Sequence, residues 1–151
     1  MDSSDPYQTP VPTDLSTAPK LTPKQILTSF DGRIPRKTFW LWGIGFGFAF
    51  GIVLGIVTAI AGPAAPTVTP AGEVITHSPG PIFFLLMLIL AVPYIWVILA
   101  LQIKRWHDRD KPGTWVLIGL IPIVGIWALI ETGFLRGTVG PNQYGPDPTE
   151  P

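Results

Sequence analysis

Six charged side chains and one histidine stand in the eleven-residue stretch Ile103–Gly113 (IKRWHDRDKPG), between two long apolar segments. His107 beside Asp108 could serve as a general base, but catalysis also needs a nucleophile, a second placed carboxylate or a metal. One histidine and two aspartates are too few for a zinc site, which takes three or four protein ligands. We therefore predict no catalytic residue, no metal and no cofactor here.

The basic side chains near this stretch have two structural uses. They can contact the phosphates of anionic lipid headgroups, or they can pair with Asp108 and Asp110 while His107 bridges by hydrogen bonds. The alternating signs of KRWHDRDK favour an internal ion-pair network. The basic residues concerned are Arg33, Arg36, Lys104 and Arg105.

The elements that position these residues are apolar enough to be membrane helices. Only 13% of the residues are charged, and the formal net charge of zero gives no reason to expect nucleic-acid binding. Uncharged runs occupy about 39–61, 82–103 and 114–135, the last being uncharged only to Ile130. A helix over 39–61 would be roughly 35 Å long, more than the ~30 Å hydrocarbon core. We predict an all-α integral membrane protein with three transmembrane helices.

Positive charge predicts the orientation of these helices. Nine of the ten Lys and Arg residues lie before the first span or in the loop 104–113, and the loop 62–81 has none. Basic loops stay in the cytoplasm, so we expect a cytoplasmic N-terminus, an outer loop 62–81 and, with three spans, a C-terminus outside. A re-entrant hairpin in the third segment is the alternative, and it would return the C-terminal tail to the cytoplasm.

The chain before the first span divides into two parts. Residues 1–21 are rich in Pro, Thr and Ser and are predicted to be a disordered tail. In TPKQILTSF, Thr22 is a suitable N-cap and Pro23 a suitable first helical residue, which predicts a short amphipathic helix at the membrane interface. The membrane domain then covers 22–148, and 149–151 form a terminal tail.

Glycines and prolines give the spans further features. Four glycines repeat every fourth residue in the first span and predict close packing against another helix, either within the chain or in another copy. Two prolines near the centres of the later spans predict helix kinks. The glycines are Gly43, Gly47, Gly51 and Gly55, and the prolines are Pro93 and Pro122.

Three motifs together resemble a known family. They are FDGRIPRKTFW at 30–40, KRWHDRDKPGTW at 104–115 and GTVGPNQYGPDP at 137–148. They are similar to motifs of the bacterial inner-membrane proteins of domain of unknown function 805. The resemblance implies a small inner-membrane protein without an established activity. The positions matching the motifs are Gly32, Arg33, Arg36, Arg105, His107, Asp108, Asn142, Gly145, Pro146 and Asp147.

We expect a non-enzymatic protein of the bacterial inner membrane that acts by helix packing with itself or with another membrane protein. Its expected surroundings are the lipid bilayer and anionic headgroups. Two alternatives stay open at this stage. One is a subunit of an oligomeric transporter or channel, and the other is a membrane-surface enzyme that uses His107 and Asp108 on lipid headgroups.

Overall fold

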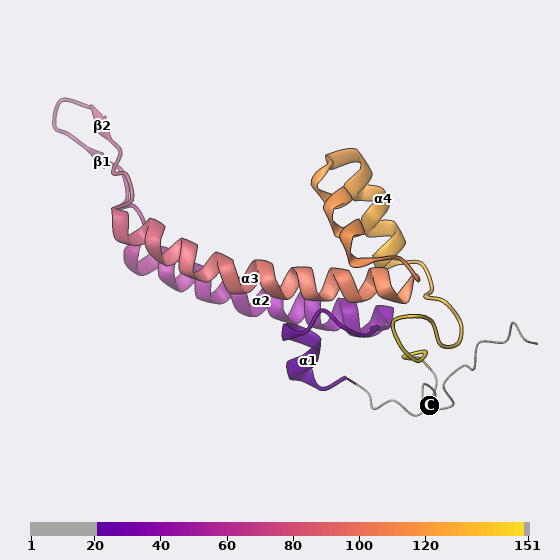
Figure 1. Cartoon of the computed structure of the whole chain (residues 1–151). Coiled ribbons are helices and arrows are strands. Elements are labelled where there is room, and N and C mark those ends of the chain that lie inside the picture. The colour runs from indigo at the N-terminus through magenta and orange to yellow at the C-terminus, as the bar shows by residue number, and fades with distance from the viewer. Residues whose placement is uncertain (1–20, 150–151) are drawn as a thin grey trace, which may run out of the picture. The chain divides into compact units, whose positions relative to one another are not determined.

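The computed structural model describes residues 21–149, which form two compact units. The first unit comprises residues 21–41 together with 99–149, and the second comprises 42–98. The elements follow the order α1, α2, β1, β2, α3, η2 and α4 (Figure 1). The predicted disordered tail lies outside the described residues except for its last residue, Leu21.

Two long helices confirm the apolar helical class. α2 covers Arg36–Ala61 and α3 covers Pro81–Asp108, so each exceeds the ~20 residues needed to cross a bilayer. In the most apolar 18-residue stretch of α2 no residue is buried, and in that of α3 6% of the residues are buried. Phe48 and Leu88 are 71% and 63% exposed. A core helix of a soluble protein would be covered, so these surfaces require lipid or another apolar partner.

Within the second unit, the two helices run side by side and are joined by a β-ribbon (Figure 1). Tyr94 stacks on Phe50 with ring centroids 4.1 Å apart and on Phe46 at 6.0 Å. The predicted outer loop contains β1 (Thr67–Val68) and β2 (Val74–Ile75), which pair antiparallel. α3 continues through Pro93 without interruption.

The glycine stripe of α2 is uncovered in this chain. A Cβ atom added at any of its four positions would meet nothing within 4 Å. The prediction that α2 packs closely through these glycines therefore has no partner among the described residues, and contact with another copy or another protein stays a prediction. The four positions are Gly43, Gly47, Gly51 and Gly55.

A short helix precedes α2, as predicted. α1 covers Pro23–Thr28, and Thr22 caps it by accepting from the Gln25 backbone N–H. The Gln25 side chain accepts from the Thr22 backbone N–H in return. This reciprocal capping box satisfies two donors that a helix N-terminus leaves free, and Ile26 is buried on the inner face of α1.

The predicted third span is not a single helix. Residues 113–120 form the 3₁₀ helix η2 (Gly113–Leu120), the chain bends at Ile121, and α4 (Pro122–Gly133) packs back against η2. Pro122 does not kink a continuing helix as predicted, because it stands at the first position of α4, where no backbone donor is needed. Gly125 permits the close return, since its Cβ would lie 2.9 Å from the Gly119 carbonyl oxygen.

The charged stretch is largely helical, although a loop was predicted over 104–113. α3 extends to Asp108, and its end is closed by Asp110 in the left-handed conformation, with φ at 57°. The Lys111 N–H donates to the Trp106 carbonyl at 2.9 Å, and the Asp110 N–H donates to His107 at 3.0 Å. This is the Schellman arrangement, which turns Lys111 back over the last turn of α3.

Candidate functional site

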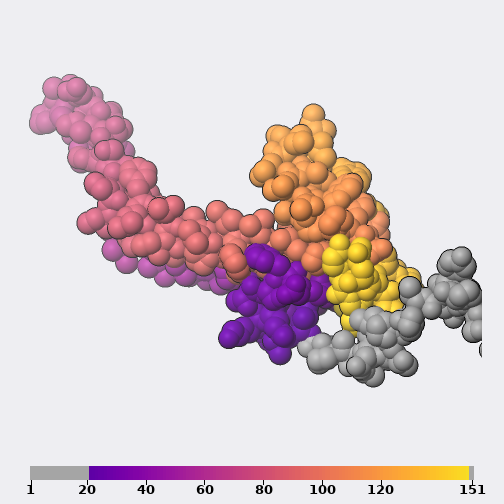
Figure 2. Space-filling view, in the orientation of Figure 1, coloured from indigo at the N-terminus to yellow at the C-terminus, as the bar shows by residue number. Residues whose placement is uncertain are grey.

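A buried cluster of two arginines and one aspartate joins segments far apart in the sequence. Arg33 precedes α2, while Arg105 and Asp108 lie three residues apart on the last turn of α3. All three are at most 5% exposed. We call Arg33, Arg105 and Asp108, with the carbonyl groups they bind, the arginine–aspartate cluster. Figure 2 shows the C-terminal segment lying against the N-terminal residues that contribute Arg33.

Arg33 uses its whole guanidinium group. Nε donates to Asp108 Oδ1 at 3.2 Å, and Nη2 lies 3.1 Å from the same oxygen. Nη1 donates to the carbonyls of Gly140 at 2.8 Å and Gly145 at 3.3 Å. Nη2 donates to the Thr138 carbonyl at 2.7 Å and to its hydroxyl at 3.0 Å. Arginine has five N–H donors. The four on Nη1 and Nη2 bind the C-terminal segment, and the one on Nε binds Asp108 on α3.

Arg105 has the same role toward α4 and the segment before α2. It donates to the carbonyls of Thr132 and Ile34, and Nη2 donates to the Leu135 carbonyl at 3.0 Å. Nη1 also pairs with Asp108 Oδ2. Buried charges are tolerated only when paired and fully hydrogen-bonded, and in this cluster the carbonyl dipoles balance the second cation.

The Asp108 carboxylate bridges the two arginines. Each carboxylate oxygen accepts from a different guanidinium, and the Asp108 backbone carbonyl accepts from the Thr138 N–H at 2.8 Å. Gly137 lies directly against the carboxylate, and a Cβ atom at this position would overlap it. Glycine is therefore required at position 137, the first residue of GTVG, because the backbone there lies against the Asp108 carboxylate.

His107 and Asn142 form a neighbouring contact. His107 Nδ1 lies 3.2 Å from the Gly32 carbonyl, which can only accept, so Nδ1 carries the proton. The ring stacks on Tyr144 with centroids 3.9 Å apart and planes 2° apart. Asn142 Nδ2 donates to the His107 carbonyl at 2.9 Å.

Two motif glycines stand at turns of the backbone. Gly32 has φ at 86° and Gly145 has φ at 135°, values that residues with a Cβ atom rarely adopt. The Gly145 N–H and carbonyl both pair with Asn142. This small closed turn presents the Gly145 carbonyl to Arg33.

Asp147, one of the motif positions, stabilises the C-terminal turn. Its Oδ2 accepts from the Gly140 N–H at 3.1 Å, and its Oδ1 accepts from the N–H and hydroxyl of Thr149. Burial opposes ionisation of this carboxyl, but the hydrogen bonds from Thr149 and Gly140, with the charge of Arg33, hold its pKa below the ordinary value. Asp147 thus supports the loop that Arg33 binds.

Other basic residues also bind backbone carbonyls. Lys104 Nζ donates to Ile26 and Ser29, and Arg36 donates to the Phe134 carbonyl at 2.7 Å. Trp40 Nε1 donates to the Gly133 carbonyl at 2.9 Å. The end of α4 is therefore fastened to the start of α2 by two further bonds.

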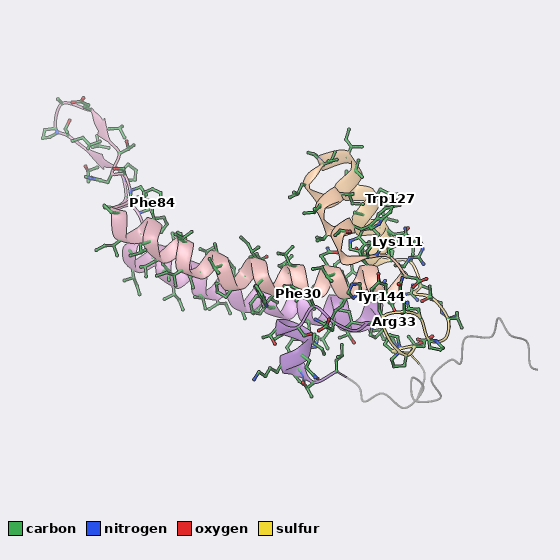
Figure 3. All side chains as sticks on the ribbon, viewed as in Figure 1. Phe30, Arg33, Phe84, Lys111, Trp127 and Tyr144 are labelled. Atoms are coloured by element: carbon green, nitrogen blue, oxygen red, sulfur yellow. The ribbon has the colours of Figure 1, made fainter. Side chains whose placement is uncertain are left out.

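A second polar group joins the end of α3 to α4. Glu131 Oε1 accepts from Arg109 at 2.8 Å and from Lys111 at 2.9 Å. The Lys111 ammonium lies over the rings of Trp106, Trp115 and Trp127, at 5.4, 4.8 and 5.2 Å from their centroids. Figure 3 shows Lys111 near Trp127.

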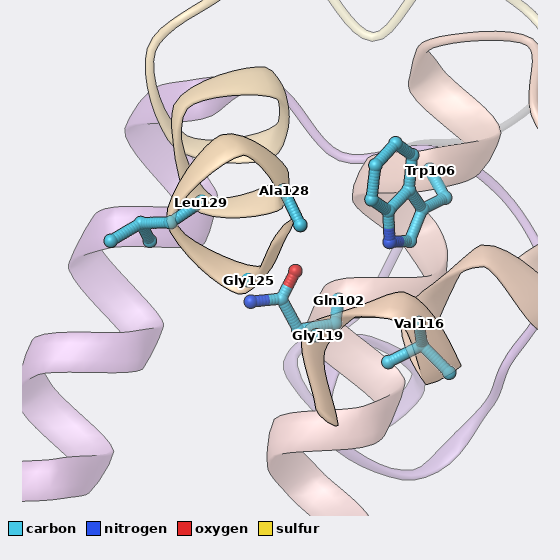
Figure 4. A pocket seen from close by; sticks show the side chains of 7 residues that line it. All are labelled: Gln102, Trp106, Val116, Gly119, Gly125, Ala128 and Leu129. Atoms are coloured by element: carbon cyan, nitrogen blue, oxygen red, sulfur yellow. The ribbon is translucent and has the colours of Figure 1, made fainter. Parts of the chain in front are cut away.

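A small cavity lies beside this group, between the end of α3, η2 and α4 (Figure 4). Its volume is about 220 Å³, below the ~300–1,000 Å³ of common ligand pockets. Gln102 contributes an amide and Trp106 an indole ring to its lining, which also includes Gly119 and Gly125. The cavity belongs to the packing of the hairpin on α3.

The hydrogen bonds of His107 and Asp108 show how these two side chains are used in this structure. His107 and Asp108 direct their hydrogen bonds to different partners, Gly32 and the two arginines. Among residues 21–149, no three His, Asp or Glu side chains are placed to hold a metal ion. The arrangement suits holding chain segments together.

The structure places many of the motif residues in contact with one another, together with several partners that the sequence analysis did not name. Hydrogen bonds and ion pairs join residues of all three motifs. These residues are Gly32, Arg33, Arg105, His107, Asp108, Asn142 and Gly145. The missed residues are Thr138, Gly137, Tyr144 and Glu131. Glu131 had a usable signal, since it is the first charge after 19 uncharged residues, 112–130.

The fold and the cluster together define a helical membrane protein whose charged residues bind one another and backbone carbonyls at one end of its two long helices. The chain belongs to the DUF805 family, described as "Protein of unknown function (DUF805)", whose pattern matches residues 27–146. The family suggested by the three motifs is therefore confirmed.

Relatives in Escherichia coli agree with this membership. The chain is 42% identical to "Inner membrane protein YhaI" over 65 residues, covering 43% of this chain and 54% of YhaI. It is 43% identical to "Inner membrane protein YhaH" over 49 residues, covering 32% of this chain and 40% of YhaH. The matched regions thus span about half the length of these two relatives.

A longer match is found with "Uncharacterized protein YiiR", which is 31% identical over 152 aligned positions, covering 84% of this chain and 90% of YiiR. No solved structure matches the chain. With the two exposed apolar helices, these relatives identify an inner-membrane protein.

Proposed function

We propose that this chain is a non-enzymatic inner-membrane protein with two spanning helices, a re-entrant hairpin formed by η2 and α4, and both ends on the cytoplasmic side. The observation that carries the proposal is the set of bonds from Arg33 to Thr138, Gly140 and Gly145. A chain with three spans would separate the two partners by the bilayer. The re-entrant path keeps them on one side.

The dimensions and charge of the hairpin support this path. η2 has eight residues and α4 has twelve, so the arms are roughly 16 and 18 Å long, about half of the ~30 Å core. The turn is apolar and exposed, with Leu120 at 80% and Ile123 at 83%. Returning the tail to the cytoplasm also places Arg136 with the other nine basic residues, in keeping with the distribution of positive charge.

Reporters at the C-terminus test this topology. A fluorescent protein that matures only in the cytoplasm should be bright when fused after Pro151, and alkaline phosphatase at the same place should be inactive. A fusion of each reporter within 62–81 is the internal control and should give the opposite pair of results. Active alkaline phosphatase at the C-terminus would refute the hairpin.

The role itself is proposed to be association through α2. The arginine–aspartate cluster keeps its charged groups occupied in structural bonds, while the glycine stripe is open. Glycines that allow close backbone approach favour helix association in membranes. A second copy or another membrane protein would cover this face.

Cysteine crosslinking tests association, because the sequence contains no cysteine and every crosslink reports an introduced residue. Gly47→Cys and Gly51→Cys should crosslink in native membranes under mild oxidation. Gly45→Cys is the matched control, since Gly45 is also open but lies off the stripe. Equal crosslinking of Gly45→Cys and Gly47→Cys would mean random collision, and no crosslink to any protein would contradict the proposal.

A further inference from the structure

Three indole rings surround the Lys111 ammonium and come from three different elements. Trp106 lies on α3, Trp115 on η2 and Trp127 on α4. Their ring centroids form a triangle with sides of 5.6, 6.1 and 6.2 Å. We call these three residues, with the carboxylate of Glu131, the aromatic cage.

The chemistry of the cage is that of an ammonium receptor. Electron-rich ring faces attract a cation within about 6 Å, and such cages are a known means of recognising alkylated ammonium groups. The three distances from Lys111 Nζ, 4.8 to 5.4 Å, meet this condition. Glu131 adds a direct ion pair at 2.9 Å.

The Lys111 ammonium occupies the cage but is partly exposed to the surroundings. The Lys111 side chain is 28% exposed, and Trp127 and Trp115 are 42% and 37% exposed. If the ammonium left, Glu131 would keep its pair with Arg109 at 2.8 Å and would not remain as an uncompensated charge. The Lys111 backbone would still be held by its bond to Trp106. The cage can therefore exchange its occupant without loss of its walls.

The surface beside the cage is suited to lipid. Ile126 and Ile130, on α4 with Trp127, are 64% and 47% exposed. A molecule with a cationic head and an apolar body would place the head among the indoles and the body along this face. Tryptophan is also favoured at the depth where headgroups meet acyl chains.

We propose that the aromatic cage is a binding site for an ammonium group, that of an amine-bearing phospholipid headgroup, and that Lys111 is its internal competitor. The proposal that a lipid supplies the ammonium group rests on the proposed insertion of the hairpin into the membrane. The proposal that the cage recognises an ammonium group does not.

The test uses Lys111→Ala, which empties the cage, purified in a maltoside detergent that carries no ammonium. Tryptophan fluorescence is followed during titration with choline and with 3,3-dimethylbutan-1-ol, its neutral isostere, at constant ionic strength. We expect saturable binding of choline and none of the alcohol. The unaltered protein should bind choline roughly tenfold more weakly, because a tethered competitor acts at a millimolar effective concentration.

Two controls make the result specific. Lys24→Ala removes an exposed lysine outside the cage and should behave as the unaltered protein. Adding Trp127→Leu to Lys111→Ala should abolish choline binding. If Lys111→Ala binds choline no better than the alcohol, the cage only anchors its own lysine and the proposal fails.

A second measurement keeps the proposal testable should Lys111→Ala not fold. In the unaltered protein, reductive ¹³C-methylation of lysines keeps their charge and labels each ammonium for NMR. The Lys111 signal should be shifted upfield by the indoles, and choline should move it toward the free position, while the alcohol should not. An unmoved signal at saturating choline would overturn the proposal.

Nanodiscs distinguish the two sources of the ammonium group. Lys111→Ala should retain phosphatidylethanolamine over phosphatidylglycerol when analysed by native mass spectrometry. Choline binding without this lipid preference would point to a soluble ammonium compound and would count against the lipid source and the inserted hairpin. If Lys111→Ala shows neither choline binding nor a preference for phosphatidylethanolamine, the aromatic cage is not an ammonium site. The topology would then still be decided by the reporter fusions.

Discussion

Replacing the cluster's carboxylate with an amide of the same shape is the most direct test of its role. Asp108→Asn leaves no cavity, so it changes charge and hydrogen bonding alone. It removes the ion pair with Arg33 at 3.1 Å and the pair with Arg105, and it leaves both buried guanidinium groups without their carboxylate. One amide nitrogen would also oppose an arginine donor.

The expected cost follows from burial. Removing one partner of a buried ion pair typically costs about 3–5 kcal/mol, because the other charge stays buried without compensation. Asp108 is 3% exposed and Arg105 is 0% exposed, so solvent offers little relief. The backbone bond from Thr138 to Asp108 remains, so we expect a folded but destabilised protein.

Unfolding in mixed micelles of maltoside and dodecyl sulfate, followed by tryptophan fluorescence, measures this loss. Asp110→Asn is the matched control, because Asp110 is exposed and asparagine tolerates its left-handed conformation. The control should change the free energy of unfolding by less than about 0.5 kcal/mol. If the two variants lose equal stability, the cluster does not hold the chain together as described.

Three further predictions concern the same unit. Gly137→Ala should destabilise by about 1–3 kcal/mol through overlap with the Asp108 carboxylate, while Gly80→Ala, in open space, should be near neutral in the same unfolding assay. Trp40→Phe should cost about 1 kcal/mol by leaving the Gly133 carbonyl without its indole donor, and an unchanged unfolding curve would contradict this bond. Because the pKa of Asp147 is lowered in the folded state, its contribution is present above its unfolded pKa of about 3.9 and is lost as pH falls through the folded value. Proteolysis of the C-terminal segment should therefore increase on acidification in this range, and Asp147→Asn should be cleaved readily at neutral pH as well; equal protection of both proteins at every pH would exclude this role.

The sequence predicted the parts of this protein that depend on local composition. Uncharged runs long enough to cross a bilayer predicted α2 and α3, because lipid exposure requires apolar side chains on every face. Thr22 and Pro23 predicted the start of α1, since capping depends only on residues within one turn.

The third apolar segment shows where local reasoning stopped. Residues 114–135 have the length of a span, and the sequence left a third transmembrane helix and a re-entrant hairpin as alternatives. The structure has the hairpin because Gly125 permits the two arms to approach, since a Cβ atom there would lie 2.9 Å from the Gly119 carbonyl oxygen. It is also held there because Arg105 binds the carbonyls of Thr132 and Leu135.

The sequence by itself determined that the apolar segments must be solvated by lipid. It also determined that the charges gather at the ends of these segments. Only tertiary contacts decided that Arg33 binds Gly140 across more than a hundred residues and that Lys111 lies among three tryptophans. Hydropathy is a sum over neighbouring residues, so a pattern can reveal it. The partner of a buried charge depends on which distant carbonyls reach it, and that is settled when the helices pack.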